Sequence, residues 1–271
     1  MQSKRGRLDR FISQQQSLPR KRVRELLLQG RVFVDGVMAT AMDLQIDEFS
    51  RIQLDDKLLQ ANEAVYLMLH KPVGVVSATK DNEHQTVIDL LQHPKRHELH
   101  IAGRLDLNSS GLLLLTNDSR WSEALMSPKT KVDKRYRVTL GNAVSESEHC
   151  VTSAELTATD KSEPSCQAEA LAHQQDQAAY IAAFANGMYF GFEDITTLPA
   201  QLEFESSNVA LVRLREGKYH QIKRMFGRFR NPVVGLHRLS IGELQLDPAL
   251  APGQSRELTA QEIALFKQCY E

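Results

Sequence analysis

The sequence predicts an α+β protein with a mostly antiparallel mixed sheet and a small, separate N-terminal domain. Short segments with strand composition dominate, and strands and helices do not alternate regularly, as they would around a parallel sheet. A polar joint at residues 60–63 separates residues 1–60 from residues 61–271. A chain of 271 residues is long enough for one large domain or two ordinary ones with a sizeable core.

The first segment is predicted to contain two short helices and a hairpin. Apolar residues at helical spacing predict a helix over residues 7–16, and a second helix is expected between Pro19 and Gly30. A hairpin follows, with Asp35-Gly36 at its turn. Basic side chains crowd the second helix and the strand after it: Arg20, Lys21, Arg22, Arg24 and Arg31.

Residues 61–271 are predicted to form further strands and helices around a polar insertion. Four consecutive leucines bounded by turn residues predict a buried strand at residues 112–115. Residues from about 145 to 179 are polar with weak periodicity, which predicts a surface insertion that is mobile or loosely helical. The other expected elements are a strand at 64–69, a short helix at 85–92, a helix at 119–126 capped by Asn117 or Asp118, strands at 134–140 and 209–214, a helix at about 219–229, another strand pair, and a last helix opened by a capping box at 259–262.

The composition excludes several classes of protein. The chain is 42% hydrophobic and 25% charged, which is typical of a soluble globular protein. No apolar run approaches the roughly 20 residues that span a bilayer, and no secretory signal follows the basic N-terminus. The cysteines are few and far apart (Cys150, Cys166 and Cys269), which argues against a disulfide scaffold or a zinc site. A cytoplasmic protein is therefore expected.

Charge is distributed unevenly along the chain. The net charge is −1, but residues 1–31 hold nine Lys and Arg against two acids, a balance of +7. Residues 143–186 hold one Lys against seven acids, a balance of −6. The basic end predicts a polyanionic partner, most simply a nucleic acid.

Asp106 is the first candidate for a chemical role. It lies in a polar loop just before the leucine strand, and catalytic groups often stand on loops carried by such rigid elements. The alternative is that Asp106 caps a turn or pairs with Arg104, as short-range Asp contacts commonly do.

A basic run at residues 216–226 could supply a partner for this acid. Tyr219, Ile222, Phe226 and Phe229 are predicted to form an apolar helical stripe; the cations beside it are Lys223, Arg224, Arg228 and Arg230. A cation from this helix would keep Asp106 ionised in a partly dry pocket. The alternative is an ordinary amphipathic helix with solvated basic residues.

The first segment resembles the alpha-L RNA-binding domain found in a ribosomal protein and in many enzymes that modify ribosomal RNA. The matching residues are 7–12 and 30–36, in two helices followed by a hairpin. The alternative is that these basic residues only form a solvated helix face. Clustering of the cations with few acids between them favours RNA binding.

Four motifs, in order, resemble those of pseudouridine synthases that modify ribosomal RNA. They are His70-Lys71-Pro72-Val73-Gly74, the run at 103–118, Lys134-Arg135-Tyr136, and the run at 216–225. The likeness covers nearly the whole chain apart from the insertion. The chain departs from the family at Ser109, where threonine is usual, and in the length of the insertion.

The resemblance implies that one uridine within an RNA chain is isomerised, without a cofactor or a metal ion. By resemblance, Asp106 is the essential nucleophile or base, Lys223 pairs with it, and Tyr136 packs on the target base. The positions expected to contact RNA are Arg104, Lys71, Arg20, Lys21, Arg22, Arg24, Arg31 and Arg224.

Three short stretches look most like the enzymes that act on small-subunit (16S) ribosomal RNA: residues 121–125, 197–200 and 236–238. The same reaction on large-subunit (23S) RNA is the nearest alternative. A noncatalytic RNA-binding assembly factor is a second, and a methyltransferase is disfavoured because no glycine-rich nucleotide loop follows a first strand. The expected partner is ribosomal RNA or a partly assembled ribosomal particle, with the protein acting as a monomer away from membranes.

Overall fold

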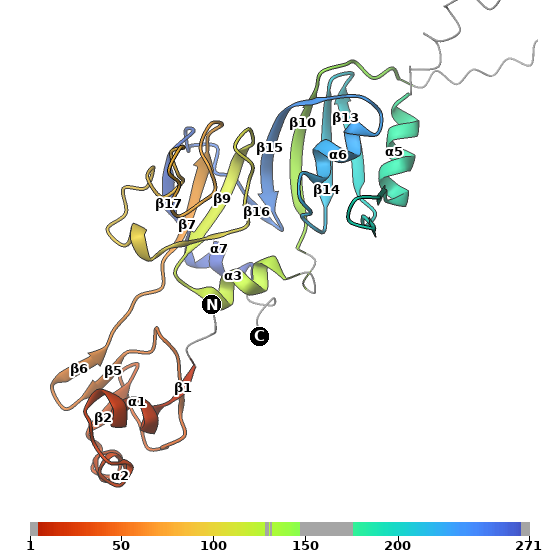
Figure 1. Ribbon diagram of the computed structural model, residues 1–271. Helices are drawn as coiled ribbons and strands as arrows, with labels where there is room; N and C mark the ends of the chain where they lie inside the picture. The colour runs from red at the N-terminus through yellow and green to blue at the C-terminus, as the bar shows by residue number, and fades with distance from the viewer. Residues whose placement is uncertain (1–4, 128–129, 131, 147–175, 267–271) are drawn as a thin grey trace, which may run out of the picture.

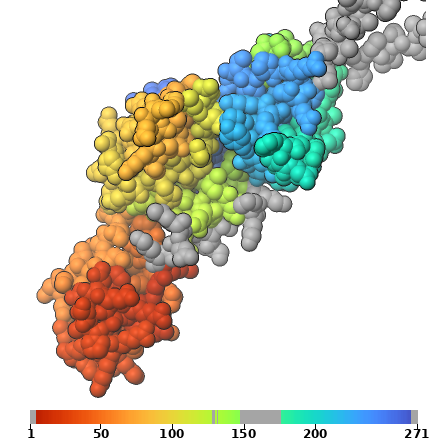
Figure 2. Space-filling view, viewed as in Figure 1, coloured from red at the N-terminus to blue at the C-terminus, as the bar shows by residue number. Residues whose placement is uncertain are grey.

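The computed structural model describes residues 5–127, 130, 132–146 and 176–266 (Figure 1). The first segment, drawn in red and orange, stands apart from a larger body that holds the remaining strands and helices (Figures 1 and 2). None of the helices in these ranges has the length and apolar character needed to cross a bilayer.

Two helices and short antiparallel strands build the first segment around its own core. Leu8 and Ile12 of the first helix and Val23 and Leu27 of the second are buried together. Both predicted helices and the hairpin are confirmed, and Pro19 directly precedes the second helix. The elements are β1 (Gly6–Arg7), α1 (Leu8–Gln15), α2 (Arg20–Leu28), β2 (Val32–Val34), β3 (Val37–Met38), β4 (Gln45–Ile46), β5 (Ile52–Leu54) and β6 (Lys57–Gln60).

A mixed sheet, nine-stranded within the described ranges, forms the larger body, and the predicted α+β class is confirmed. Its main order is β13-β14-β10-β15-β9-β7-β17, while β8 pairs with β9 and β16 with β15. All these neighbours are antiparallel except β15 and β9. The strands are β7 (Tyr66–Lys71), β8 (His100–Ala102), β9 (Ser110–Thr116), β10 (Lys134–Leu140), β13 (Gln201–Ser206), β14 (Val209–Leu214), β15 (Val233–Ile241), β16 (Leu244–Gln245) and β17 (Ser255–Glu257).

The parallel contact between β9 and β15 joins two halves of the sheet. Only two residue pairs form it, His237 with Ser110 and Arg238 with Gly111. The half with β7 and β9 and the half with β10 and β14 diverge on either side of this contact (Figure 1). We refer to this two-pair contact as the seam.

Strand β9 is buried on both faces, which explains its four leucines. Leu113 and Leu115 belong to the core that includes Phe184 and Phe226, whereas Leu112 and Leu114 face the core around Trp121. Helices α5 and α6 therefore cover one face, and α3 lies on the other (Figure 1). The remaining elements are η1 (Arg96–Glu98), α3 (Ser119–Met126), α5 (Gln177–Asn186), β11 (Tyr189–Phe190), β12 (Ile195–Thr196), α6 (Gln221–Gly227) and α7 (Ala260–Ala264).

The prediction of a helix at residues 85–92 was wrong. Thr86 pairs with Val76 in a bridge, and its backbone N–H and hydroxyl both donate to the Asp89 carboxylate at 2.8 Å. These bonds close a turn in place of a helix.

Two further predictions need correction. The helix expected at 219–229 spans only α6, because His220 has φ +49° and Tyr219 is 74% exposed outside the apolar stripe. Helix α5 begins at Gln177, within the predicted polar insertion, and was missed. The rest of that insertion, residues 147–175, lies outside the described residues.

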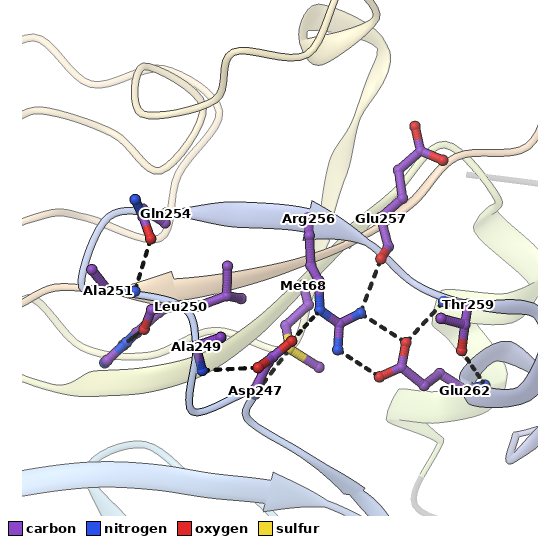
Figure 3. A network of polar contacts seen from close by, with 11 residues as sticks. Met68, Asp247, Ala249, Leu250, Ala251, Gln254, Arg256, Glu257, Thr259 and Glu262 are labelled. Carbon is purple, nitrogen blue, oxygen red and sulfur yellow. Dashed lines mark hydrogen bonds and ion pairs between the residues drawn. The ribbon is translucent and has the colours of Figure 1, made fainter.

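A polar network fixes the edge strand β17 (Figure 3). The Arg256 guanidinium lies between two carboxylates, 2.6 Å from Asp247 and 2.7 Å from Glu262. The bonds from Arg256 lower the pKa of Glu262 from 4.5 to about 2. Glu262 also completes the predicted capping box with Thr259. The stability from this carboxylate is present above pH 4.5 and is lost as the pH falls toward 2.

Candidate active site

Asp106 lies on the loop between β8 and β9, next to the seam. Its Oδ2 atom is 3.3 Å from Lys223 Nζ and 3.5 Å from His220 Nε2, and its side chain is 33% exposed. The structure thus brings together Asp106 and Lys223 from opposite halves of the sheet. The Arg104 side chain makes no ion pair or hydrogen bond with any part of the chain that the structure describes, so the carboxylate is not held by its neighbour in sequence.

Buried polar side chains hold the backbone of this loop. Their hydrogen bonds go to three carbonyl groups: from Lys71 to Ser109 at 2.7 Å, from Ser77 to Leu105 at 2.7 Å and from Arg238 to Gly103 at 3.1 Å. Since an unmade buried hydrogen bond is costly, each donor restricts the loop to one conformation. The carboxylate of Asp106 is therefore presented from a rigid support.

Gly111 permits the close approach of β9 and β15 at the seam. It has φ +108°, and a Cβ atom there would lie 2.3 Å from the backbone oxygen of Arg238. Glycine is thus required both by the backbone conformation and by the space. The Arg238 side chain reinforces the same contact by donating to the Leu112 carbonyl at 2.7 Å.

Lys71 was expected to contact RNA, and the structure contradicts this. Its side chain is fully buried, and its Nζ donates to backbone carbonyls of the Asp106 loop. Burial lowers the pKa of Lys71 from 10.5 to about 8, against the opposing attraction of Asp106. Lys71 supports the loop from inside and does not reach the surface.

The buried amine predicts a pH-dependent contribution to stability. Between pH 8 and 10.5 the unfolded chain keeps the Lys71 proton that the folded chain has released, so stability rises with pH. We expect the unfolding free energy of the wild type relative to Lys71→Met to increase by on the order of 3 kcal/mol across this interval. Denaturant unfolding of both proteins at pH 7 and pH 10 measures it. A difference that is the same at both pH values contradicts the assignment.

The turn before α6 is fastened so that His220 and Lys223 face the acid. Gln221 is buried, accepts from the Lys218 N–H at 3.0 Å and donates to Glu216 at 2.8 Å. The sequence reasoning missed His220. Its place in the run at 216–225, three residues before Lys223, is the signal that would have indicated it.

A pocket surrounds the Asp106 carboxylate, lined by Arg104, Tyr136, Ser109 and Leu236 among others. Tyr136 lies on β10, is 8% exposed and belongs to the apolar core. The Ser109 hydroxyl is buried and has no hydrogen-bond partner among the described residues. It is a polar group available to a molecule that enters the pocket.

The other residues predicted to contact RNA differ in whether their charges are already paired with acidic side chains. Arg31 is paired in two hydrogen bonds with Asp55, and Arg22 with Glu25 at 2.7 Å. Arg224 lies over the Phe190 ring at 3.8 Å and is paired with Glu193. Arg20 lies 3.9 Å from Asp9, whereas Lys21 and Arg24 are exposed and make no side-chain bond to the described part of the chain.

Comparison with known proteins adds independent observations. The family model described as RNA pseudouridylate synthase matches residues 65–227. This stretch contains Asp106, Tyr136 and Lys223. The chain belongs to the RNA pseudouridylate synthase family. The resemblance inferred from the four motifs is confirmed.

Individual relatives match over nearly the full chain. A ribosomal small subunit pseudouridine synthase A of Pseudomonas aeruginosa is 43% identical over 95% of this chain and 98% of the relative. A protein of the same name from Vibrio cholerae is 37% identical, with the same coverage. A solved pseudouridylate synthase structure covers 96% of this chain and 99% of its own, with a TM-score of 0.61 and 34% identity. The likeness therefore includes the first segment as well as the larger body.

Proposed function

We propose that this protein isomerises one uridine of small-subunit ribosomal RNA to pseudouridine, with Asp106 as the nucleophile or base. The observation that carries the proposal is the Asp106 carboxylate, rigidly supported in a pocket and paired with Lys223 Nζ at 3.3 Å. The names of the full-length relatives favour the small subunit over the large one.

The reaction needs a carboxylate and no group carrier. The bond between N1 and C1′ of the uridine breaks, the base turns while bound, and C5 forms a new bond to C1′. C5 then loses its proton and N1 gains one, so the product is an isomer of the substrate. The Asp106 carboxylate, which faces Lys223 and His220, is the group positioned to act as the nucleophile or base.

The pocket accepts a base only after the base has left its stack. Extrusion costs a few kcal/mol, and packing of the uracil against Tyr136 offsets part of this cost. Arg104 is exposed at the pocket rim, where it can occupy the gap left in the RNA or contact a phosphate. Ser109 offers its unpaired hydroxyl to the bound nucleotide.

Residues 1–60 act, in this proposal, as an alpha-L RNA-binding domain attached to a catalytic domain of residues 61–271. The separate core of the first segment and its exposed cations support this division. Phosphate contacts from this domain would position the substrate without reading its sequence.

We expect the free cations of α2 to contribute more to RNA affinity than the paired ones. Replacing both Lys21 and Arg24 with Gln should weaken binding of a ribosomal RNA fragment and lower the slope of log K against log salt by about 2. The matched control replaces both Arg22 and Arg31 with Gln, because Glu25 and Asp55 already pair with these arginines. Equal losses in the two variants, measured by salt titration of binding, would contradict the assignment.

The substrate is either free ribosomal RNA or a partly assembled particle, and we propose that the protein acts on it as a monomer in the cytoplasm. Pseudouridine mapping of both ribosomal RNAs, in cells with and without this protein, tests the function. Loss of one pseudouridine from the small subunit supports the proposal. If a pseudouridine is lost only from the large-subunit RNA, the proposed reaction stands but the proposed target is wrong. If no pseudouridine is lost from either RNA, the proposed reaction and the proposed target are both contradicted.

A further inference from the structure

The most exposed aromatic side chains of the described residues lie on two adjoining segments, the β11–β12 hairpin and the turn before α6. Phe192 is 98% exposed, Tyr219 74% and Tyr189 51%, and every other aromatic side chain in these ranges is at least partly buried. We call these three residues the exposed aromatic cluster. Large exposed aromatic rings gathered together are typical of a binding surface.

Arginines of α6 tie the parts of this cluster together. Phe192 and Tyr189 belong to the β11–β12 hairpin, whose Glu193 pairs with Arg224. Arg224 also donates to the Tyr219 carbonyl at 3.4 Å, and Arg228 donates to the Tyr189 carbonyl. The hairpin and the turn before α6 are therefore held side by side.

The exposed aromatic cluster adjoins the pocket through a pair of stacked rings. The rings of Tyr219 and His220 have centroids 3.9 Å apart and planes 21° from parallel. His220 Nε2 in turn lies 3.5 Å from Asp106 Oδ2. One ring separates the open face of Tyr219 from the carboxylate.

The Tyr219 ring is supported by stacking on its neighbour. His220 is held at φ +49° by the anchored turn, and the His220 ring supports Tyr219 from beneath. A ring that already packs on another loses less conformational entropy on binding than an unsupported surface side chain. Glu193 is paired with Arg224, and Asp194 of the same hairpin accepts from the Tyr189 hydroxyl at 2.9 Å.

We propose that the exposed aromatic cluster binds unpaired bases of the substrate RNA that adjoin the target uridine, with Tyr219 stacking on the nearest of them. Flat rings beside a pocket for an extruded base suit single-stranded nucleotides, since every base offers a π face. The inference rests on the proposed function, because it assumes a uridine in the Asp106 pocket. The inference adds that the target uridine lies in an unpaired segment of the RNA. It also adds that Phe192 contacts the next unpaired base.

Binding of a synthetic RNA tests this contact. The RNA spans the mapped uridine, and a set of copies each carries one abasic nucleotide within three positions of it. We expect Tyr219→Ala to weaken binding of the intact RNA by about tenfold, and Tyr219→Trp to retain it. With the copy that lacks the stacked base, wild type and Tyr219→Ala should bind equally. Phe192→Ala should also weaken binding of the intact RNA, and this loss should disappear with a copy whose abasic nucleotide is at a different position.

Two controls keep the test decisive. Leu265→Ala removes an exposed apolar side chain near the end of α7 and should bind like the wild type. Conversion of the intact RNA by the wild type is measured separately, so failure of the proposed function is seen without any variant. Unchanged affinity in Tyr219→Ala, or an equal loss with every abasic copy, would overturn the inference.

Discussion

Asp106→Asn should abolish pseudouridine formation and leave RNA binding nearly intact. The amide keeps the shape of the carboxylate but can neither attack a carbon atom nor accept a proton at neutral pH. Loss of the carboxylate leaves Lys223 Nζ, which is 3.3 Å away, without its anionic partner. The added positive charge at the site is compatible with binding of a polyanionic substrate. We expect the single-turnover rate to fall below detection, with the dissociation constant changed by less than about threefold.

Rapid-quench assays and equilibrium binding of one RNA fragment measure the two quantities. Asp56→Asn makes the same chemical change at an exposed position of the first segment and should retain activity. Parallel loss of binding and activity in Asp106→Asn would show that this carboxylate holds the substrate or the fold, and would remove the catalytic assignment.

Gly111→Ala should destabilise the protein strongly. The new Cβ would lie 2.3 Å from the Arg238 oxygen and 2.6 Å from the Arg238 nitrogen, both backbone atoms that cannot move aside alone. The two strands of the seam would have to move apart, which would also weaken the hydrogen bonds that support the Asp106 loop. We expect a loss of on the order of 3–5 kcal/mol in unfolding free energy, measured by denaturant titration.

Gly74→Ala is the matched control, because it separates backbone strain from the clash. Gly74 has φ +85°, but an added Cβ there meets no atom within 4 Å. Its replacement should cost only about 1 kcal/mol, the strain of a left-handed alanine. Equal losses at the two glycines would mean that the seam tolerates the extra atom.

Local patterns in the sequence predicted many elements closely. Strands β10 and β14 and helix α3 span the predicted residues, and Asp118 caps α3 by accepting from two backbone N–H groups. Period-two alternation, helical periodicity and capping residues act over a few neighbouring positions, so one segment of sequence contains the whole signal.

The errors came where distant contacts decide the outcome. At His220 a left-handed backbone leaves Tyr219 outside the apolar stripe and starts the helix later than predicted, and the anchoring bonds through Gln221 and Glu216 could not be read from periodicity. Lys71 looked like a surface cation, yet its stem and ammonium group are enclosed by the Asp106 loop. Charge alone does not reveal whether a lysine faces solvent or supports a neighbouring loop.

The order of strands in the sheet constrains when this protein can begin to work. Strand β15 is the last long strand to leave the ribosome during synthesis, yet it takes a central place between β10 and β9. A nascent chain that ends before β15 has Asp106 and Lys223 but lacks the strand that joins their two halves of the sheet. We expect partial translation products that end before β15 to lack the assembled site, because the strand that joins its two halves is absent.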